Sequence, residues 1–171
     1  FEDEFASEIP DADAEKIRTK AQQAEALGFV EYWSSDHIGA ADPFLALQYA
    51  ADVTTTLHVG PLVLNNEFHH PVMIARSMAS LDRLTGGRAI LGLGTGYAQA
   101  EHDATSIPLR PRGPRVTRLG ESVEVIRALF DDGACHFDGE HHHIALDDIG
   151  VRPVQDKLPI LIGGHGRRVV G

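Results

Sequence analysis

The segment LHVGPLVLNNEFHHPVMIARSMASLDRLTGGRAILGLGTGY, residues 57–97, contains the clearest alternation of strand and helix signals in the chain. It begins with the mostly apolar run Leu57–Leu64, which is typical of a strand buried on both faces. Pro71 then begins a helix with apolar residues at helical spacing, and Thr85-Gly86-Gly87 ends it. Arg88–Leu93 follows as a second strand. Strand, helix and strand in this order predict a parallel β-α-β unit.

The flanking segments continue the alternation in both directions. Ala14–Leu27 is predicted to be a helix, Phe29–Trp33 a strand, Asp42-Pro43 a helix start, 107–114 a loop, Val116–Leu129 a helix, 134–145 a hairpin, Pro159–Ile162 a strand and Arg167 a helix start. This pattern predicts an α/β fold of parallel (β/α) units with ligands at the carboxyl ends of the strands. A TIM (β/α)8 barrel needs about 250 residues. The 171 residues therefore indicate half of such a barrel or a small open sheet.

Composition argues against several classes of function. The chain has 15 basic and 25 acidic residues, a net charge of −10, which opposes binding to nucleic acid. No apolar run approaches the roughly 18 residues that cross a bilayer. The single cysteine, Cys135, permits no internal disulfide and is typical of the cytoplasm. We expect a cytoplasmic protein that acts on a small molecule, without nucleic acid or membrane.

The predicted domain organisation is simple. Residues 1–13 form an irregular acidic segment, and residues 14–171 form one partial barrel domain. The chain begins with Phe1 rather than Met, so we expect it to be a piece of a longer protein.

Two polar segments follow predicted strands. Asp36-His37 places a titratable base beside a neighbour that can orient or charge it, although a loop-capping Asp and a solvated His fit the same pattern. Asn65-Asn66 has amides that can bond the edge of a heterocycle, or that can simply form an Asx turn.

Two glycine segments follow the other strands. Around Gly94-Thr95-Gly96, backbone N–H groups can approach an anion or a cofactor ring closely. The dinucleotide-binding pattern fails because Tyr97 stands where a glycine is needed. The spacing also resembles the first motif of S-adenosylmethionine-dependent methyltransferases, but prolines from Pro108 to Pro114 interrupt the helix that should follow. Gly163-Gly164 precedes a helix start and is typical of a phosphate site.

The ten histidines do not predict a metal site. Successive residues of a strand face opposite sides, so His141-His142-His143 cannot all bind one ion without distortion. We expect this triplet on an exposed hairpin and predict no metal. The chain has no Gly-x-Ser-x-Gly motif, and a covalent nucleophile is not indicated.

Taken in order, seven motifs resemble those of the bacterial luciferase-like monooxygenase superfamily. They are AEALGF (24–29), SDH (35–37), VGPLVLN (59–65), ASLDRLTGGR (79–88), LGLGTGY (91–97), FDGEH (137–141) and PILIGG (159–164). Within the superfamily, the chain looks most similar to oxidoreductases that use the deazaflavin coenzyme F-420. The resemblance extends from about Ala14 onward and corresponds to roughly the N-terminal half of a (β/α)8 barrel.

The resemblance implies a cofactor at the carboxyl-terminal mouth of the barrel. Asp36 and His37 would lie beside the redox ring, with His37 as acid or base. Leu62-Val63 would form a bulge with a non-prolyl cis peptide that backs the ring, and Asn65 would bond its pyrimidine edge. The cofactor chain would pass close to Gly94, Thr95 and Gly96, and its phosphate would be held by Gly163 and Gly164.

The resulting hypothesis is hydride transfer between coenzyme F-420 and an unknown organic substrate, with His37 handling a proton. With FMN instead, the same pocket would serve a monooxygenase. A non-catalytic barrel fragment, or a chain that completes its sheet as a homodimer, is a further alternative, whereas the methyltransferase interpretation explains only one motif. Sugar-phosphate dehydrogenases of this group carry an acidic residue where this chain has Tyr97, so their substrate and acid are not transferred.

Overall fold

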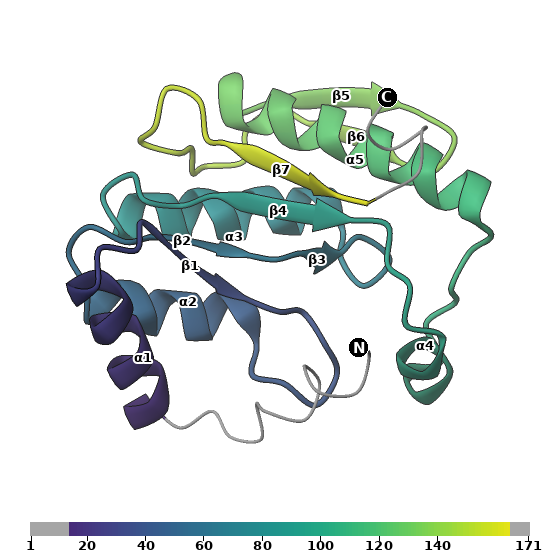
Figure 1. Cartoon of the computed structure of the whole chain (residues 1–171). Helices are drawn as coiled ribbons and strands as arrows, with labels where there is room; N and C mark the ends of the chain where they lie inside the picture. The colour runs from purple at the N-terminus through teal and green to yellow at the C-terminus, as the bar shows by residue number, and fades with distance from the viewer. Residues whose placement is uncertain (1–13, 165–171) are drawn as a thin grey trace.

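The computed structural model describes residues 14–164, and Figure 1 shows the order of its elements. The helices are α1 (Ala14–Ala26), α2 (Pro43–Asp52), α3 (Pro71–Leu84), α4 (Gln99–Thr105) and α5 (Arg112–Asp131). The strands are β1 (Glu31–Ser34), β2 (His58–Pro61), β3 (Leu64–Asn65), β4 (Leu91–Gly94), β5 (Cys135–Asp138), β6 (His143–Leu146) and β7 (Ile160–Gly163). The predicted irregular segment 1–13 and the helix start at Arg167 lie outside the described residues.

Parallel strands follow one another in chain order. β1 pairs with β2, and β3, β4 and β7 are neighbours in that order. A bridge between Val59 and Ala89 links β2 to the segment before β4. Doubly wound open sheets reverse their strand order at a switch point, and no reversal occurs among these strands of residues 14–164. The described fold is therefore one wall of a barrel rather than a small open sheet.

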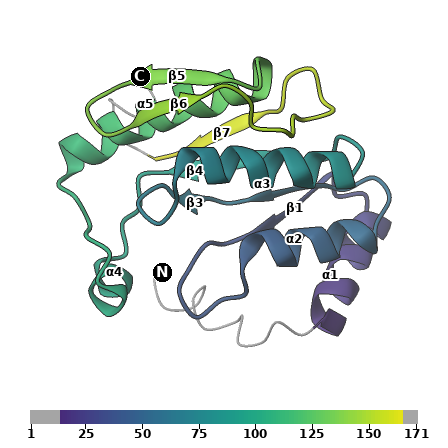
Figure 2. The ribbon, with the colours of Figure 1, turned by 180° about the vertical axis from the view of Figure 1, so that it is seen from behind.

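Helices α2 and α3 cover one face of this sheet, as the two opposite views in Figures 1 and 2 show. The core between the two layers is aliphatic, and most of its side chains are fully buried. It includes Leu47 of α2, Val59 and Leu64 of the sheet, Ile74 and Met78 of α3, Leu91 and Leu93 of β4, and Ile126 and Leu129 of α5. Burial of this apolar area is the main term that holds the wall together.

The ends of the first helices match the sequence signals. Gly28 follows α1 with a φ of 83°, a conformation that glycine adopts without strain. The Asp42 carboxylate accepts a hydrogen bond of 3.1 Å from the Leu45 amide at the start of α2. The first strand begins two residues later than predicted, at Glu31.

One prediction that is wrong concerns the strand over Leu57–Leu64. The structure divides it into β2 and β3, because the chain between them bulges at Leu62-Val63, where the peptide bond is cis. The cis bond lies at the position that the family resemblance implied. Apolar patterning cannot detect such a break, since the bulge residues are as apolar as the strand itself.

Two further differences follow the glycine turn. Helix α4 was not predicted, because its seven residues carry no apolar stripe. Helix α5 begins at Arg112, inside the predicted loop 107–114. Pro114 is compatible with this start because the first turn of a helix needs no N–H donor at that position.

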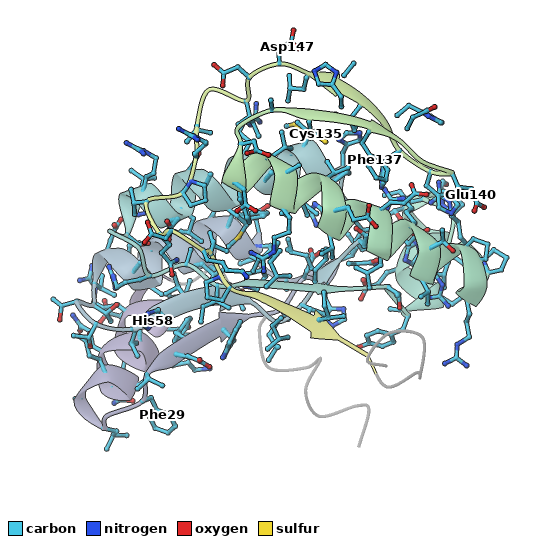
Figure 3. All side chains as sticks on the ribbon, turned by 90° about the horizontal axis from the view of Figure 1, so that it is seen from above. Phe29, His58, Cys135, Phe137, Glu140 and Asp147 are labelled. Atoms are coloured by element: carbon cyan, nitrogen blue, oxygen red, sulfur yellow. The ribbon has the colours of Figure 1, made fainter. Side chains whose placement is uncertain are left out.

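The β5–β6 hairpin docks on α5 and corrects another expectation. Figure 3 places Phe137 on this hairpin and Glu140 at its tip. The Glu121 carboxylate of α5 accepts hydrogen bonds of 2.7–3.0 Å from three backbone amides at the tip, those of residues 140–142. His142 is only 4% exposed, and its Nε2 lies 3.0 Å from the Ser122 hydroxyl. The histidine triplet is therefore not an exposed decoration, because its middle member is a docking contact.

The glycines of β4 and β7 make room for the bulge. A Cβ at Gly94 would lie 2.7 Å from Val63 Cγ2, and one at Gly163 would lie 2.9 Å from the same atom. At Gly92 a Cβ would lie 2.0 Å from the Pro61 carbonyl oxygen and 3.1 Å from Val63 Cγ1. The Val63 side chain thus fills space that three glycines leave vacant.

We expect Gly94→Ala to lower the free energy of unfolding by about 1–3 kcal/mol, since the added methyl overpacks against Val63. The double variant with Val63→Ala should lose less than the sum of the two single variants. Urea unfolding measures all three. Gly120→Ala is the control, since nothing lies within 4 Å of its Cβ, and it should gain up to about 1 kcal/mol. Additive losses would contradict the packing argument.

Burial, with further contributions from the charge of Arg118 and from His70, lowers the pKa of His142 from 6.5 to about 4. The folded state therefore binds fewer protons at this site than the unfolded chain. Its contribution to stability is fully present above pH 6.5 and is lost as the pH falls towards 4. We expect His142→Gln, which does not titrate, to lose less stability than the wild type between pH 7 and pH 4. Equal losses by urea unfolding at each pH would refute this origin.

Candidate active site

A cavity of about 410 Å³ lies at the carboxyl ends of the parallel strands. The strand register puts Asn65, Gly94 and Gly163 side by side in one row, which is why distant segments meet here. All ten residues predicted for the site line this cavity: Asp36, His37, Leu62, Val63, Asn65, Gly94, Thr95, Gly96, Gly163 and Gly164. Leu64, Tyr97, Ala98 and Glu101 line it as well. The cavity has the size of a small-molecule site.

The Asp36 carboxylate holds the chain just after the bulge. Its Oδ2 accepts a hydrogen bond of 2.8 Å from the backbone N–H of Asn65, and His69 Nε2 lies 2.8 Å from the same oxygen. The side chain is largely buried. Asp36 therefore ties the end of β1 to β3, and its described bonds go to these two residues rather than to His37.

The contacts of His37 come from the segment after β4. Its Nδ1 lies 2.6 Å from the Glu101 carboxylate of α4, and its Nε2 lies 3.5 Å from the Tyr97 hydroxyl. The rings of Tyr97 and His37 meet edge to face with centroids 6.0 Å apart. The neighbour that can orient this histidine is thus Glu101 and not the adjacent Asp36.

Asn65 is 7% exposed, and its side chain belongs to a chain of hydrogen bonds. Its Oδ1 accepts from the Glu67 amide at 3.0 Å, and its Nδ2 lies 3.0 Å from His102 Nε2. His102 Nδ1 lies 2.9 Å from the Ile107 carbonyl oxygen, which can only accept. The His102 proton therefore sits on Nδ1, and its Nε2 accepts from the Asn65 amide. The second N–H of the Asn65 side chain has no partner in this chain of hydrogen bonds.

Two side chains determine the shape of the glycine turn after β4. Gly96 has a φ of 75°, and a Cβ there would lie 2.2 Å from Asn65 Oδ1, so only glycine fits. The Arg115 guanidinium donates a hydrogen bond to the Gly96 carbonyl oxygen. The turn is therefore held against β3 on one side and against α5 on the other.

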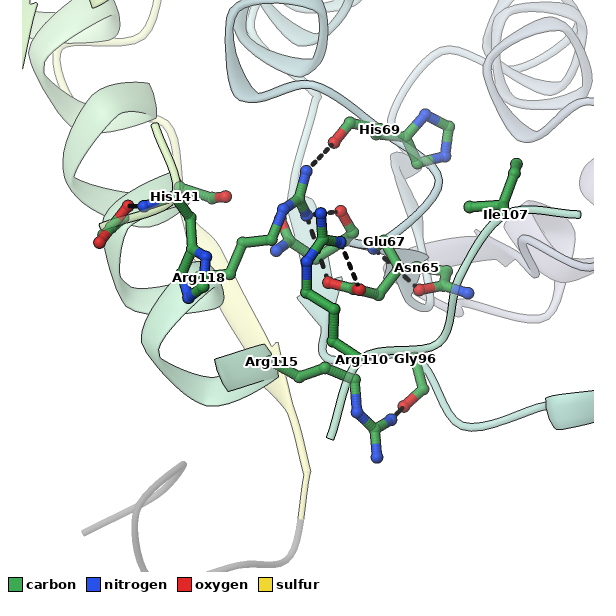
Figure 4. Close-up of polar contacts among 12 residues, drawn as sticks. Asn65, Glu67, His69, Gly96, Ile107, Arg110, Arg115, Arg118 and His141 are labelled. Atoms are coloured by element: carbon green, nitrogen blue, oxygen red, sulfur yellow. Dashed lines mark hydrogen bonds and ion pairs between the residues drawn. The ribbon is translucent and has the colours of Figure 1, made fainter. Parts of the chain in front are cut away.

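Three arginines fix the loops behind the cavity, as Figure 4 shows. Arg110 and Arg118 both pair with the buried Glu67 carboxylate, at 2.8 Å and 3.5 Å. Arg118 also donates to the backbone carbonyls of Asn66 and His69. The N–H groups of Arg110 and Arg118 are thus bonded to residues 66–69, so these arginines stabilise the loop behind the cavity and do not line it.

Sequence reasoning missed Glu101, His102 and His69 as parts of this arrangement. No element is predicted for residues 98–106, although Gln99–Thr105 contains the good helix formers alanine, glutamate and glutamine. That composition was the one available signal. The contact partners themselves are set by the tertiary fold, which brings α4 to β3 and to the loop after β1.

Two absences hold for residues 14–164. None of the helices there is both long and apolar enough to cross a membrane. No group of three or more His, Cys, Asp or Glu residues in that range is arranged to hold a metal ion.

A family model described as luciferase-like monooxygenase matches residues 4–171. The chain belongs to this family. Among its relatives, the 5,10-methylenetetrahydromethanopterin reductase of Methanopyrus kandleri is 29% identical over 170 residues, covering 92% of this chain and 48% of that protein. The F-420-dependent glucose-6-phosphate dehydrogenase of Kineococcus radiotolerans is 32% identical over 160 residues, covering 88% and 47%. The chain thus spans about half the length of these relatives.

Solved structures of luciferase-like proteins have the same fold. The coenzyme F-420-dependent tetrahydromethanopterin reductase from Methanopyrus kandleri superposes with a TM-score of 0.86 at 28% identity. The match covers 95% of this chain and 50% of that one. The predicted family and the predicted barrel architecture, incomplete in this chain, are confirmed.

Proposed function

We propose that this luciferase-like protein is an oxidoreductase that transfers a hydride between the deazaflavin coenzyme F-420 and a small organic substrate. The observation that carries the proposal is the cavity itself. It combines a titratable histidine, His37, with an apolar floor at Leu62-Val63 and side-chain-free backbone at the glycine turns. Two of the proteins named above, the glucose-6-phosphate dehydrogenase and the tetrahydromethanopterin reductase of known structure, are F-420-dependent by name.

The lining suits a flat, partly polar ring. Leu62 is half exposed and offers apolar surface for a ring face. Gly94, Gly96 and Gly163 line the cavity with backbone atoms alone, since Val63 and Asn65 take the space on their Cβ side. Asn65 keeps one amide proton for a ring edge, and Asp36 presents a carboxylate at the same rim.

When bound, the deazaflavin supplies hydride transfer, and the protein supplies binding, orientation and proton handling. We assign Asp36, Leu62, Val63 and Asn65 to the ring, Gly94, Thr95 and Gly96 to the cofactor chain, and Gly163 and Gly164 to its phosphate. His37 moves a proton at Nε2, the ring nitrogen that does not contact Glu101.

The finer features of the proposal rest on composition. We propose cytoplasmic activity on a small molecule, because the charge of −10 and the single cysteine oppose nucleic acid and disulfide chemistry. We further propose that two copies of the chain form a homodimer.

Coenzyme identity is tested by titrating the chain side by side with oxidised coenzyme F-420 and with FMN, followed by fluorescence. We expect saturable binding of the deazaflavin and at least tenfold weaker binding of FMN. A preference for FMN would overturn the deazaflavin assignment in favour of a flavin monooxygenase. Binding of neither would contradict cofactor binding by this chain.

The role of His37 is tested by His37→Ala, assayed with coenzyme F-420 and a panel of small primary and secondary alcohols. We expect turnover to fall by about 10²–10⁴-fold, the usual contribution of a general acid or base, while the Kd for the cofactor changes little. His58→Ala is the matched control, since this exposed histidine begins β2 at the opposite end of the strand (Figure 3). A His37→Ala variant with full turnover removes His37 from the mechanism.

A further inference from the structure

Glu101 lines the cavity, but the proposed cofactor contacts give it no role. Its carboxylate lies 2.6 Å from His37 Nδ1. Among the histidine–carboxylate pairs of residues 14–164, only the exposed pair His143–Asp138 on the hairpin is equally close. The Glu101 side chain is 18% exposed and that of His37 is 38% exposed. The pair is thus partly screened from water, where a charge-assisted hydrogen bond is stronger than on the surface.

The position of Glu101 is enforced by its neighbour in the sequence. His102 is 2% exposed and is held at both ring nitrogens, by Asn65 of β3 and by the Ile107 carbonyl. Its ring also packs against Phe68, with centroids 4.6 Å apart. With His102 anchored in this way, the preceding residue of α4 is directed to the end of β1, where His37 lies.

The hydrogen-bonding rules then decide the protonation pattern of His37. A carboxylate can only accept, so the nitrogen that faces Glu101 must carry a proton. In the neutral ring the other nitrogen, Nε2, is therefore an acceptor, and it faces the Tyr97 hydroxyl at the cavity. Without such a partner, a neutral imidazole is a mixture of both tautomers.

We propose that Glu101 is a positioning residue that holds neutral His37 in the Nδ1–H tautomer, so that Nε2 faces the cavity as a proton acceptor. This inference rests on the proposed function only for its catalytic consequence. When the substrate is an alcohol of the panel above, its oxidation would send a hydride to the cofactor and the hydroxyl proton to Nε2, and the resulting imidazolium is then hydrogen-bonded to the Glu101 carboxylate. The same arrangement returns the proton in the reductive direction.

The direct test is ¹⁵N NMR of the histidine-labelled chain at an alkaline pH at which the imidazoles are neutral. The His37→Asn variant identifies the His37 signals by their loss. We expect the wild type to have Nδ1 protonated and Nε2 unprotonated. A proton on Nε2 in the wild type overturns the proposal without the need for any other variant.

The Glu101→Ala variant should shift both His37 nitrogens towards the averaged values of a tautomer mixture. The His102 signals provide an internal control, because they stay in place if α4 remains docked. Asp103→Asn is the matched variant. It removes another carboxylate of α4, one that accepts a hydrogen bond from Gln99 and does not contact His37. It should leave the His37 signals unchanged. Unchanged His37 signals in Glu101→Ala would refute the positioning role.

A kinetic readout separates this inference from the proposed function. In the alcohol assay, Glu101→Ala should lower kcat about 100-fold and leave the cofactor Kd within twofold, as expected for a group that acts through the base. If the cofactor fails to bind while the wild-type tautomer is as expected, the proposed function fails and the role of Glu101 stands. If the cofactor binds but the wild type carries the proton on Nε2, the proposed function stands and the role of Glu101 fails.

Discussion

The contact between the Val63 side chain and the three glycines of β4 and β7 underlies the arrangement of the site. The two methyl groups of Val63 fill the volume that side chains at these strand positions would otherwise take. This packing keeps the bulge level with the ends of β4 and β7. Asn65 then lies where Asp36 can hold its amide and where its side chain reaches His102. Through His102, the same packing sets the place of α4 and hence of the carboxylate that faces His37.

The sequence predicted this architecture well wherever apolar periodicity and turn residues carried the information. The alternation around 57–97, the helix start at Asp42-Pro43 and the hairpin within 134–145 all reappear in the structure. The positions of the cavity residues followed from the family motifs and from the rule that strand ends meet at one edge. The failures have a common cause. Helix α4, the break at Leu62-Val63 and the burial of His142 depend on contacts between distant segments, which apolar periodicity does not report.

Asp36 and His37 illustrate the same limit at the scale of two residues. Both residues lie in the loop after β1, which ends at Ser34, and their side chains point in different directions. Asp36 turns back to brace β3, while His37 turns towards α4 and the glycine turn. Proximity in the sequence suggested a pair, but the geometry gives each residue its own partner. The pair that does form joins residues separated by 64 positions.

The small size of α4 affects how new specificities can arise in such a protein. Within this helix only His102 is counted among the buried residues, so the element contributes little to the aliphatic core. Mutations at its other positions can alter the cavity rim with a small penalty in folding. A chemically important carboxylate thus sits on a segment that is free to diversify, while the barrel wall that supports it stays under tight steric constraint. Stability and chemistry are in this way separable targets for selection and for engineering.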